Sequence, residues 1–194
     1  MTQIVLATHN PHKIAEFQQI VLRVRPDFEV IGYDGPEPVE DGVTFAQNAL
    51  IKARAAAAHT GLTALADDSG ICVDVLGGSP GVFSAYWAGH KKDDAANLDL
   101  LLDQIGDVTD PHRGAHYTSV IAVVTPEGEE RTVEGIWPGR VATEPRGDGG
   151  FGYDPVFVPD DDTRSAAELA AEEKNAVSHR ARAFEHLQPI LAAL

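Results

Sequence analysis

The 194-residue sequence is poor in cysteine and in basic residues, and it contains no long apolar run. Its one cysteine, Cys72, lies in an apolar segment, so no disulfide can form within the chain and a small buried side chain is expected there. No segment combines a basic start with the apolar stretch of a signal peptide, and no run is long enough to cross a bilayer. We therefore expect a soluble, cytoplasmic protein.

Basic side chains are half as numerous as acidic ones: 15 Lys and Arg stand against 30 Asp and Glu, for a formal net charge of −15. A surface with this excess repels nucleic acid and anionic membranes at long range, so neither is expected as a partner. A small anionic substrate is still compatible with the charge, but it needs a local basic pocket, a metal ion or both.

The hydrophobic pattern changes its period along the chain, and this change predicts the fold class. Strand-like runs at residues 3–8 and 27–35 alternate with helical patterns at 9–24 and 44–61. Later, residues 115–141 alternate in polarity around the turn sequence TPEGEE, which is typical of an antiparallel hairpin. This order predicts an α/β fold with a mixed β-sheet, without an internal repeat or a clear linker.

Capping residues mark the expected helix boundaries. Asn10 and Pro11 suit the N-cap and the first position of the first helix. Thr44 with Gln47 forms a capping box for the second helix, and Gly61 marks its end. Further helices are expected at 93–106, 165–177 and 178–194, with caps at Asp93 or Asp94, at Ser165 with Glu168, and at Ser178, and with a bend at Pro189.

Two adjacent aspartates, Asp67 and Asp68, interrupt the apolar sequence ALADDSGICVDV. Asp is depleted inside strands, so one interpretation is a solvated turn through Ser69 and Gly70. The other is a cation site, because Mg²⁺ binds one or two carboxylates together with substrate phosphates, and such a carboxylate can also accept a proton from water. Neighbouring strand residues point to opposite faces, so we expect Asp68 to reach a ligand and Asp67 to support the turn from behind.

The sequence THNPHK, residues 8–13, places a strand directly before a helix N-terminus. Free backbone N–H groups and the helix dipole favour an anion there, and Thr8, Asn10 and Lys13 add donors and a charge. The segment is not a Walker A loop, because the paired glycines and the Lys-Ser/Thr dipeptide are missing. Taken alone, the segment is better explained by plain helix capping.

Asn48 and Lys52 lie four residues apart on the second expected helix and therefore share one face. Glu40 and Asp41 come shortly before this helix. A solvated polar face is the simpler interpretation of these residues on helix statistics alone.

The sequence GGFGYD, residues 149–154, is a glycine-rich loop with two aromatic side chains. Glycines let a ligand approach the backbone, and Phe151 or Tyr153 offers a face on which a base can stack, although a loop leading into a strand would look the same.

His112 and His116 have helical zinc-site spacing, but the intervening glycine and the missing acid argue against a metal there.

A second basic cluster, at Lys174, Ser178, His179 and Arg180, lies at an expected junction between helices. Each of these residues alone is typical of a protein surface. In combination, the motifs supply a phosphate-binding turn, carboxylates for a hard cation, an aromatic platform and basic donors in an acidic chain. That combination indicates a base-bearing anionic ligand, such as a nucleoside triphosphate.

Five motifs resemble those of the inosine triphosphate pyrophosphatases, also called XTP/dITP diphosphatases, in the same order and over nearly the whole chain: LATHNPHK, EDGVTFAQNALIKA, ADDSGICVDVLGGSPGVFSA, GGFGYDPVF and AAELAAEEKNAVSHR. The resemblance implies one domain over residues 1–194, with an elongated mixed sheet flanked by helices and two lobes around a central nucleotide-binding cleft. It also implies a homodimer and Mg²⁺-dependent hydrolysis of ITP, dITP and XTP to the monophosphate and pyrophosphate, which cleanses the nucleotide pool.

The family motifs also imply roles for individual residues. Glu40 and Asp68 resemble Mg²⁺ ligands, and Asp68 resembles the general base that activates water for attack at the α-phosphorus. The implied substrate contacts are Thr8, His9, Asn10, Pro11, His12, Lys13, Lys52, Ser69, Phe151, Gly152, Tyr153, Asp154, Lys174, His179 and Arg180. Among these, Lys174, His179 and Arg180 resemble the residues that recognise the base, through its 6-oxo group.

The chain departs from the family pattern at two positions. The family usually has Gly where this chain has His9, and it commonly has Arg where this chain has Tyr86. Arg113 or Arg140 could replace the missing arginine, and the sequence does not decide between them. Two alternative functions are a pyrophosphatase for another nucleotide on a related fold and a nucleotide sensor without turnover.

Overall fold

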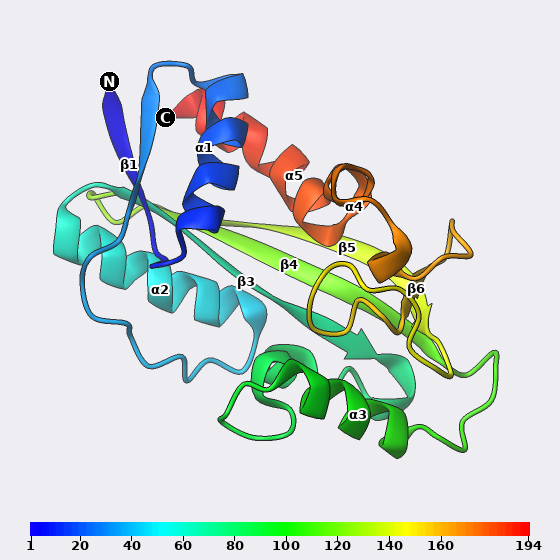
Figure 1. The fold of residues 1–194 in the computed structure, drawn as a ribbon. Coiled ribbons are helices and arrows are strands. Elements are labelled where there is room, and N and C mark those ends of the chain that lie inside the picture. Colours follow the sequence, from blue (N-terminus) through cyan, green and yellow to red (C-terminus); the bar gives the residue numbers. More distant parts are fainter. The chain divides into compact units, whose positions relative to one another are not determined.

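The structure is a computed structural model of residues 1–194, and it describes the backbone throughout and every side chain except that of His12 (Figure 1). Within this described part the strands are β1 Thr2–Leu6, β2 Phe28–Gly32, β3 Thr63–Val73, β4 Gly114–Val124, β5 Glu130–Val141 and β6 Phe157–Pro159. The α-helices are α1 Pro11–Val24, α2 Phe45–Thr60, α3 Asp94–Gln104, α4 Ala171–Val177 and α5 His179–Ala193. Short 3₁₀ helices are η1 Asp74–Leu76, η2 Gly81–Tyr86 and η3 Ala166–Glu168.

The strands form a mixed sheet in the order β2-β1-β3-β4-β5-β6. β1 pairs in parallel with both β2 and β3, which places Ile4 opposite Val30 and Leu6 opposite Leu65. β6 pairs antiparallel with β5. β4 and β5 are neighbours joined by a short turn, in which the N–H of Thr125 donates to the carbonyl of Glu129 at 3.0 Å. The predicted α/β fold with a mixed sheet and a late hairpin is confirmed.

The chain divides into two compact units, and the boundary falls inside β3, between Asp68 and Ser69. The first unit comprises Met1–Asp68, Ser119–Gly135 and Ala183–Leu194. The second comprises Ser69–Thr118 and Ile136–Arg182. The predicted site residues therefore belong to both units. Those up to Asp68 lie in the first unit, and those from Ser69 to Arg180 lie in the second.

The first unit has a separate apolar layer on each face of its strands. One layer packs α1 and α5, through residues such as Phe17 and Leu187, against strand residues that include Leu65. The other packs the alanine-rich α2 against strand residues that include Ala64 and Ala66. Because successive strand residues point to opposite faces, residue 67 faces the α1 layer and residue 68 faces the α2 layer.

The second unit is built around an aromatic core. Tyr117 of β4 packs edge-on against Phe157 of β6, with 4.7 Å between ring centroids, and near Trp137 of β5 at 6.5 Å. Leu101 of α3 closes the same cluster. This core supports the residues that precede and follow β6, where several predicted site residues lie.

The helix caps largely follow the sequence. Thr44 Oγ1 accepts the N–H of Gln47 at 3.2 Å, and α2 ends at Gly61, whose φ of 68° favours glycine. The side chain of Asp93 caps α3. The capping box of Ser165 starts only the short η3, and α4 begins later, at Ala171. The continuous helix predicted for 165–177 is therefore wrong. No helix in the described part of the chain has the length and apolar character needed to cross a membrane.

β3 runs without interruption from Thr63 to Val73, so the predicted turn through Ser69 and Gly70 is wrong. Gly70 has a packing role instead. A Cβ at this position would lie 2.4 Å from the carbonyl oxygen of Gly81 and 2.4 Å from Ser84 Oγ. The glycine thus lets η2 approach the strand closely, and Ser84 Oγ accepts the N–H of Ile71 at 3.0 Å.

Candidate functional site

Asp67 and Asp68 point to opposite faces of β3 and contact lysines of different helices. Asp67 faces α1, where Lys13 Nζ lies 2.9 Å from each of its carboxylate oxygens. Asp68 faces α2, where Lys52 Nζ lies 3.0 Å from Oδ1. The expected opposite orientation is confirmed, but Asp67 forms an ion pair and does not back a turn. A nearby cation offsets the cost of burying each carboxylate, which allows both acids inside a strand.

The Lys13–Asp67 pair ties the first turn of α1 to β3. The Asp67 side chain is 7% exposed and that of Lys13 is 32% exposed, so water screens this pair only in part. Lys13 is the third residue of α1. Its predicted contact with phosphate stays a prediction, and in the structure its ammonium donates to Asp67.

Lys52 brings the two predicted cation ligands to one point. Its Nζ lies 3.0 Å from Glu40 Oε2 and 3.0 Å from Asp68 Oδ1. Lys52 and Asp68 are largely buried, with 15% and 16% of their side chains exposed. The loop that carries Glu40 is fastened to α2, because the N–H of Gly42 donates to Asn48 Oδ1 at 2.9 Å.

The electrostatics of this cluster favour an additional cation. Burial raises the pKa of Asp68, Lys52 opposes that rise and Glu40 adds to it, so the pKa lies above its ordinary value. Burial lowers the pKa of Lys52, but Asp68, Asp67 and Glu40 outweigh burial and raise it overall. Carboxylates therefore outnumber ammonium groups around Lys52, and their combined field attracts positive charge.

The donor set fits Mg²⁺, although it is small. Among the described residues no group of three or more His, Cys, Asp or Glu side chains could hold a metal by itself. Asp68 Oδ2 is buried and has no hydrogen-bond partner within the described part of the chain. Mg²⁺ commonly takes one or two carboxylates and fills its other positions with phosphate oxygens and water. Glu40 and Asp68, which already share one cation, match that requirement.

The predicted anion-binding turn forms between β1 and α1. The N–H of Asn10 donates to Thr8 Oγ1 at 3.2 Å, and the carbonyl of Asn10 accepts the N–H of Ile14 at 3.2 Å. Pro11 is the first residue of α1, as its fixed φ suggests. The helix N-terminus and its polar residues are thus where the sequence predicts them, while their contact with phosphate stays a prediction.

Of the two histidines in this turn, the structure describes the side-chain contacts of His9 but not those of His12. His9 stacks nearly parallel to Tyr33, with 5.8 Å between ring centroids, and its ring nitrogens face Glu37 and the carbonyl of Gly35. The side chain of His12 lies outside the described residues. Its predicted substrate contact therefore stays a prediction.

In the second unit, three predicted residues gather around a fourth, Phe151. Asp154 is 2% exposed, accepts the N–H of Phe151 at 2.8 Å, and forms a buried ion pair with Lys174. Lys174 Nζ lies 4.6 Å, and the guanidinium carbon of Arg180 5.3 Å, from the centre of the Phe151 ring. Both cations lie over the ring, and Phe151 is 58% exposed, so part of this aromatic side chain is open to a ligand.

Tyr153 does not offer a second stacking face. It is 5% exposed, and its hydroxyl donates to the carbonyl of Ser84 at 2.8 Å. Burial raises its pKa above the ordinary tyrosine value. The neighbouring Gly152 has a φ of 60° and donates its N–H to Asp94 Oδ2 at 3.1 Å. Phe151 is thus the candidate for stacking on a base, while Tyr153 and Gly152 shape the loop. The remaining predicted contact, Ser69, is half-buried and directly follows Asp68 on β3.

Sequence reasoning missed Tyr117, which connects two predicted substrate-contact residues. Its ring stacks on that of His179 with 4.7 Å between centroids and 12° between planes, and its hydroxyl donates to Asp154 Oδ1 at 3.4 Å. Burial raises the pKa of Tyr117 well above its ordinary value. In the sequence, Tyr117 is one residue of an alternating strand, and only the packing of α5 reveals its partner His179.

Arg113 cannot replace the arginine that the family commonly has at the position of Tyr86. Its guanidinium is buried and donates to the backbone carbonyls of Val141, Ile105, Val108 and Ala142 at 2.7–2.9 Å. Each of its nitrogens therefore has a structural partner. Tyr86 stacks on His90 with 5.4 Å between ring centroids.

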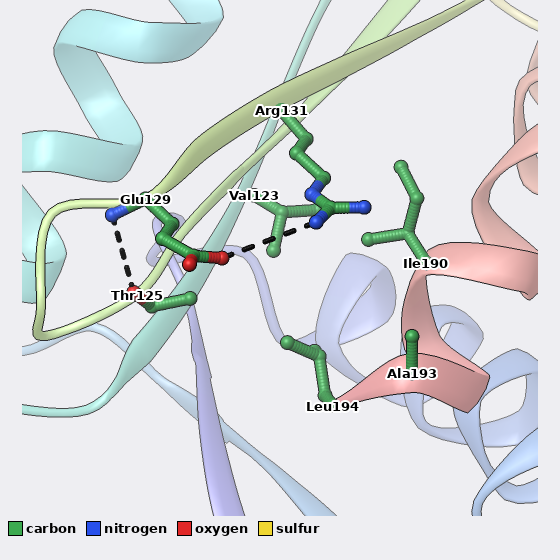
Figure 2. Close-up of a pocket in the computed structure, with 7 residues that line it drawn as sticks. All are labelled: Val123, Thr125, Glu129, Arg131, Ile190, Ala193 and Leu194. Carbon is green, nitrogen blue, oxygen red and sulfur yellow. Dashed lines mark hydrogen bonds and ion pairs between the residues drawn. The ribbon is translucent and has the colours of Figure 1, made fainter.

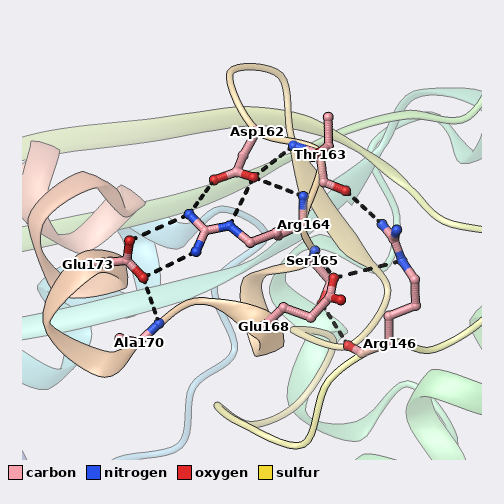
Figure 3. A network of polar contacts seen from close by, with 8 residues as sticks. All are labelled: Arg146, Asp162, Thr163, Arg164, Ser165, Glu168, Ala170 and Glu173. Atoms are coloured by element: carbon pink, nitrogen blue, oxygen red, sulfur yellow. Dashed lines mark hydrogen bonds and ion pairs between the residues drawn. The ribbon is translucent and has the colours of Figure 1, made fainter.

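A polar network fixes the segment before α4 (Figure 3). Arg164 donates to Asp162 at 2.8 Å and to Glu173 at 3.3 Å, and Glu173 also accepts the N–H of Ala170. The guanidinium of Arg164 lowers the pKa of Asp162 to about 2. Glu173 directly precedes Lys174, so the network sets where α4 begins and where Lys174 is placed.

A cavity of about 50 Å³ lies elsewhere in the first unit (Figure 2). Its lining residues are Val123, Thr125, Glu129, Arg131, Ile190, Ala193 and Leu194. Small-molecule pockets usually enclose roughly 300–1,000 Å³, so this cavity cannot accommodate a nucleotide. It contains no predicted site residue.

Comparison with known proteins finds similar chains of full length. A dITP/XTP pyrophosphatase from Leifsonia xyli is 62% identical over 194 residues, which are 100% of this chain and 98% of the relative. A solved Ham1 protein from Coxiella burnetii has a TM-score of 0.93 at 41% identity, with 100% of both chains covered. A dITP/XTP pyrophosphatase structure from Mycobacterium abscessus has a TM-score of 0.84 at 50% identity, covering 97% of this chain and 100% of that one.

The family model described as the Ham1 family matches residues 4–190. The match spans both compact units and all the predicted site residues. Together with relatives of high identity and full length, it shows that this chain belongs to the Ham1 family.

Proposed function

We propose that this chain is a dITP/XTP pyrophosphatase, which hydrolyses non-canonical purine nucleoside triphosphates such as dITP, XTP and ITP to the monophosphate and pyrophosphate. The observation that carries the proposal is the cluster in which Lys52 contacts both Glu40 and Asp68, in a chain whose relatives bear that name. This chemistry removes deaminated purines from the nucleotide pool.

The turn before α1, Lys13 and Lys52 are the proposed phosphate-binding groups. The turn before α1 offers backbone N–H groups at the positive end of a helix dipole, and Thr8 and Asn10 add polar side chains. Lys13 and Lys52 supply ammonium groups, which can exchange their carboxylate partners for phosphate oxygens. Together these groups stabilise the charge that develops on the leaving pyrophosphate.

Glu40 and Asp68 would hold Mg²⁺, which when bound supplies a counter-charge to the phosphate oxygens. Asp68 is also the general base. Its carboxylate, which contacts Lys52 through Oδ1, orients a water molecule and accepts its proton. In the metal-free protein, burial raises the pKa of this carboxyl above its ordinary value.

Phe151, Lys174 and Arg180 are the proposed base-recognition residues. Phe151 is an exposed aromatic side chain suited to stacking, and Lys174 and Arg180, whose cations lie over its ring, are hydrogen-bond donors next to it. Both donate to the 6-oxo group of hypoxanthine or xanthine but cannot accept from the amino group of adenine. A buried donor left facing an amino group costs about 1–3 kcal/mol, which favours the deaminated purines.

A nucleotide panel with Mg²⁺ tests this function. We expect pyrophosphate from dITP, XTP and ITP, and much lower kcat/KM for dATP. Release of orthophosphate, or of pyrophosphate from a pyrimidine or modified nucleotide only, would indicate another phosphohydrolase. Binding of ITP with Mg²⁺ but without turnover would indicate a sensor.

The resemblance also supports a homodimer in the cytoplasm, as a proposal of its own. Sedimentation velocity at micromolar concentration tests the dimer. A single species with the mass of one 20.7 kDa chain would contradict it.

A further inference from the structure

His9 connects the turn before α1 to the segment that follows β2. Its Nδ1 lies 3.2 Å from Glu37 Oε1, and its Nε2 lies 3.2 Å from the carbonyl oxygen of Gly35. Both neighbours are acceptors, so the imidazole donates one hydrogen bond when neutral and two when protonated. In either form the ring keeps at least one bond to this segment.

The segment folds back over Tyr33, on which His9 stacks. Tyr33 is 6% exposed, and its hydroxyl donates to the carbonyl of Pro36 at 3.0 Å. A Cβ at Gly35 would lie 2.4 Å from the Tyr33 hydroxyl oxygen, so only glycine allows this close approach. The planes of His9 and Tyr33 differ by 13°, which makes the histidine part of the same packed unit.

The same segment continues to Glu40 and is fastened again at α2. The N–H of Gly42 donates to Asn48 Oδ1 at 2.9 Å, and the N–H of Val43 donates to Gln47 Oε1 at 2.7 Å. Glu40 lies between this attachment and that of His9, and its carboxylate reaches Lys52. Its position therefore depends on attachments on both sides.

We propose that His9 is a positioning residue: it anchors the segment 35–37 and thereby holds Glu40 beside Lys52. The implied direct contact of His9 with substrate is replaced by this role, because both ring nitrogens face the segment. The proposal rests on the proposed function only in that Glu40 serves there as a cation ligand.

Hydrogen exchange of the metal-free protein tests the anchor without substrate. In His9→Ala, amides of residues 35–43 should exchange roughly three- to ten-fold faster, the effect of about one net hydrogen bond. His9→Phe keeps an aromatic ring on Tyr33 but has no ring donor, and we expect it to exchange faster than wild type as well. His112→Ala, which alters an exposed histidine in the second unit, is the matched control and should leave these rates unchanged.

Activity assays give the second readout. In His9→Ala the Mg²⁺ concentration for half-maximal pyrophosphate release should rise by roughly the same factor, while kcat at saturating Mg²⁺ stays within about twofold. Unchanged exchange in both His9 variants would overturn the proposal, and so would a raised KM for dITP at saturating Mg²⁺ with wild-type exchange. A wild-type protein without pyrophosphate release would contradict the proposed function alone, because the exchange experiment needs no turnover.

Discussion

Lys13 and Asp67 form a two-oxygen ion pair, with Lys13 Nζ 2.9 Å from both carboxylate oxygens, on the face of β3 opposite to Asp68. Two consecutive acids of one strand thus face two different helices, and each acid forms an ion pair with a lysine of the helix it faces. The two acids therefore have different roles: Asp67 attaches the start of α1 to the strand, and Asp68 faces the Lys52–Glu40 cluster.

Asp68→Asn should lower kcat for dITP by on the order of 10²–10⁴, the usual contribution of a positioned general base. The change keeps the shape of the side chain but removes its capacity to accept a proton. Pyrophosphate release under saturating Mg²⁺ measures the effect. Asp67→Asn is the matched comparison, and it should retain clearly more turnover; an equal loss in both variants would contradict the separate roles.

The Asp68 carboxyl of the metal-free protein should take up its proton at a higher pH than an ordinary aspartate, whose pKa is about 3.9. Its pKa is raised on folding, so its contribution to stability is complete below about pH 3.9 and is lost as pH rises through the folded-state pKa. Lys52→Met removes the main group that lowers this pKa and should move the midpoint further up. Carboxyl carbon NMR titration measures both midpoints, and a downward shift in Lys52→Met would refute the assigned electrostatics.

Arg113→Met should reduce the free energy of unfolding by at least about 3 kcal/mol, because several buried carbonyls lose their donor. Arg113→Lys should recover only part of this, since an ammonium cannot reproduce the planar guanidinium contacts. Urea unfolding measures the loss. Arg131→Met, at an exposed arginine 3.9 Å from Glu129, is the control and should stay within about 0.5 kcal/mol of wild type.

Lys174→Met should reduce the preference for dITP over dATP by roughly tenfold, the value of one hydrogen bond to the 6-oxo group. The ratio of kcat/KM for the two nucleotides measures it. Because Lys174 also pairs with buried Asp154, the double variant Asp154→Asn with Lys174→Met separates the two effects. A preference that survives in both variants would remove Lys174 from base recognition.

Local signals in the sequence were sufficient for several elements of the fold. The caps of α2 and α3 follow from side chains within three residues of the helix start. The opposite orientation of Asp67 and Asp68 follows from the two-residue period of a strand. Each of these inferences needs only short-range geometry, which a single sequence contains.

Contacts between residues far apart in the chain could not be predicted from the sequence. The turn predicted at Ser69 and Gly70 is absent because Lys13, 54 residues from Asp67, neutralises a carboxylate that would otherwise resist burial. Tyr117 was missed for the same reason, since its stacking partner His179 lies on another element. The His9 attachment likewise joins residues 26 and 28 positions apart.

Hydrolysis of dITP in ¹⁸O-labelled water tests the central claim most directly. If Asp68 activates a water molecule for attack at the α-phosphorus, one ¹⁸O atom appears in the phosphate of dIMP and none in pyrophosphate. Label in pyrophosphate, or release of orthophosphate in its place, would contradict the account.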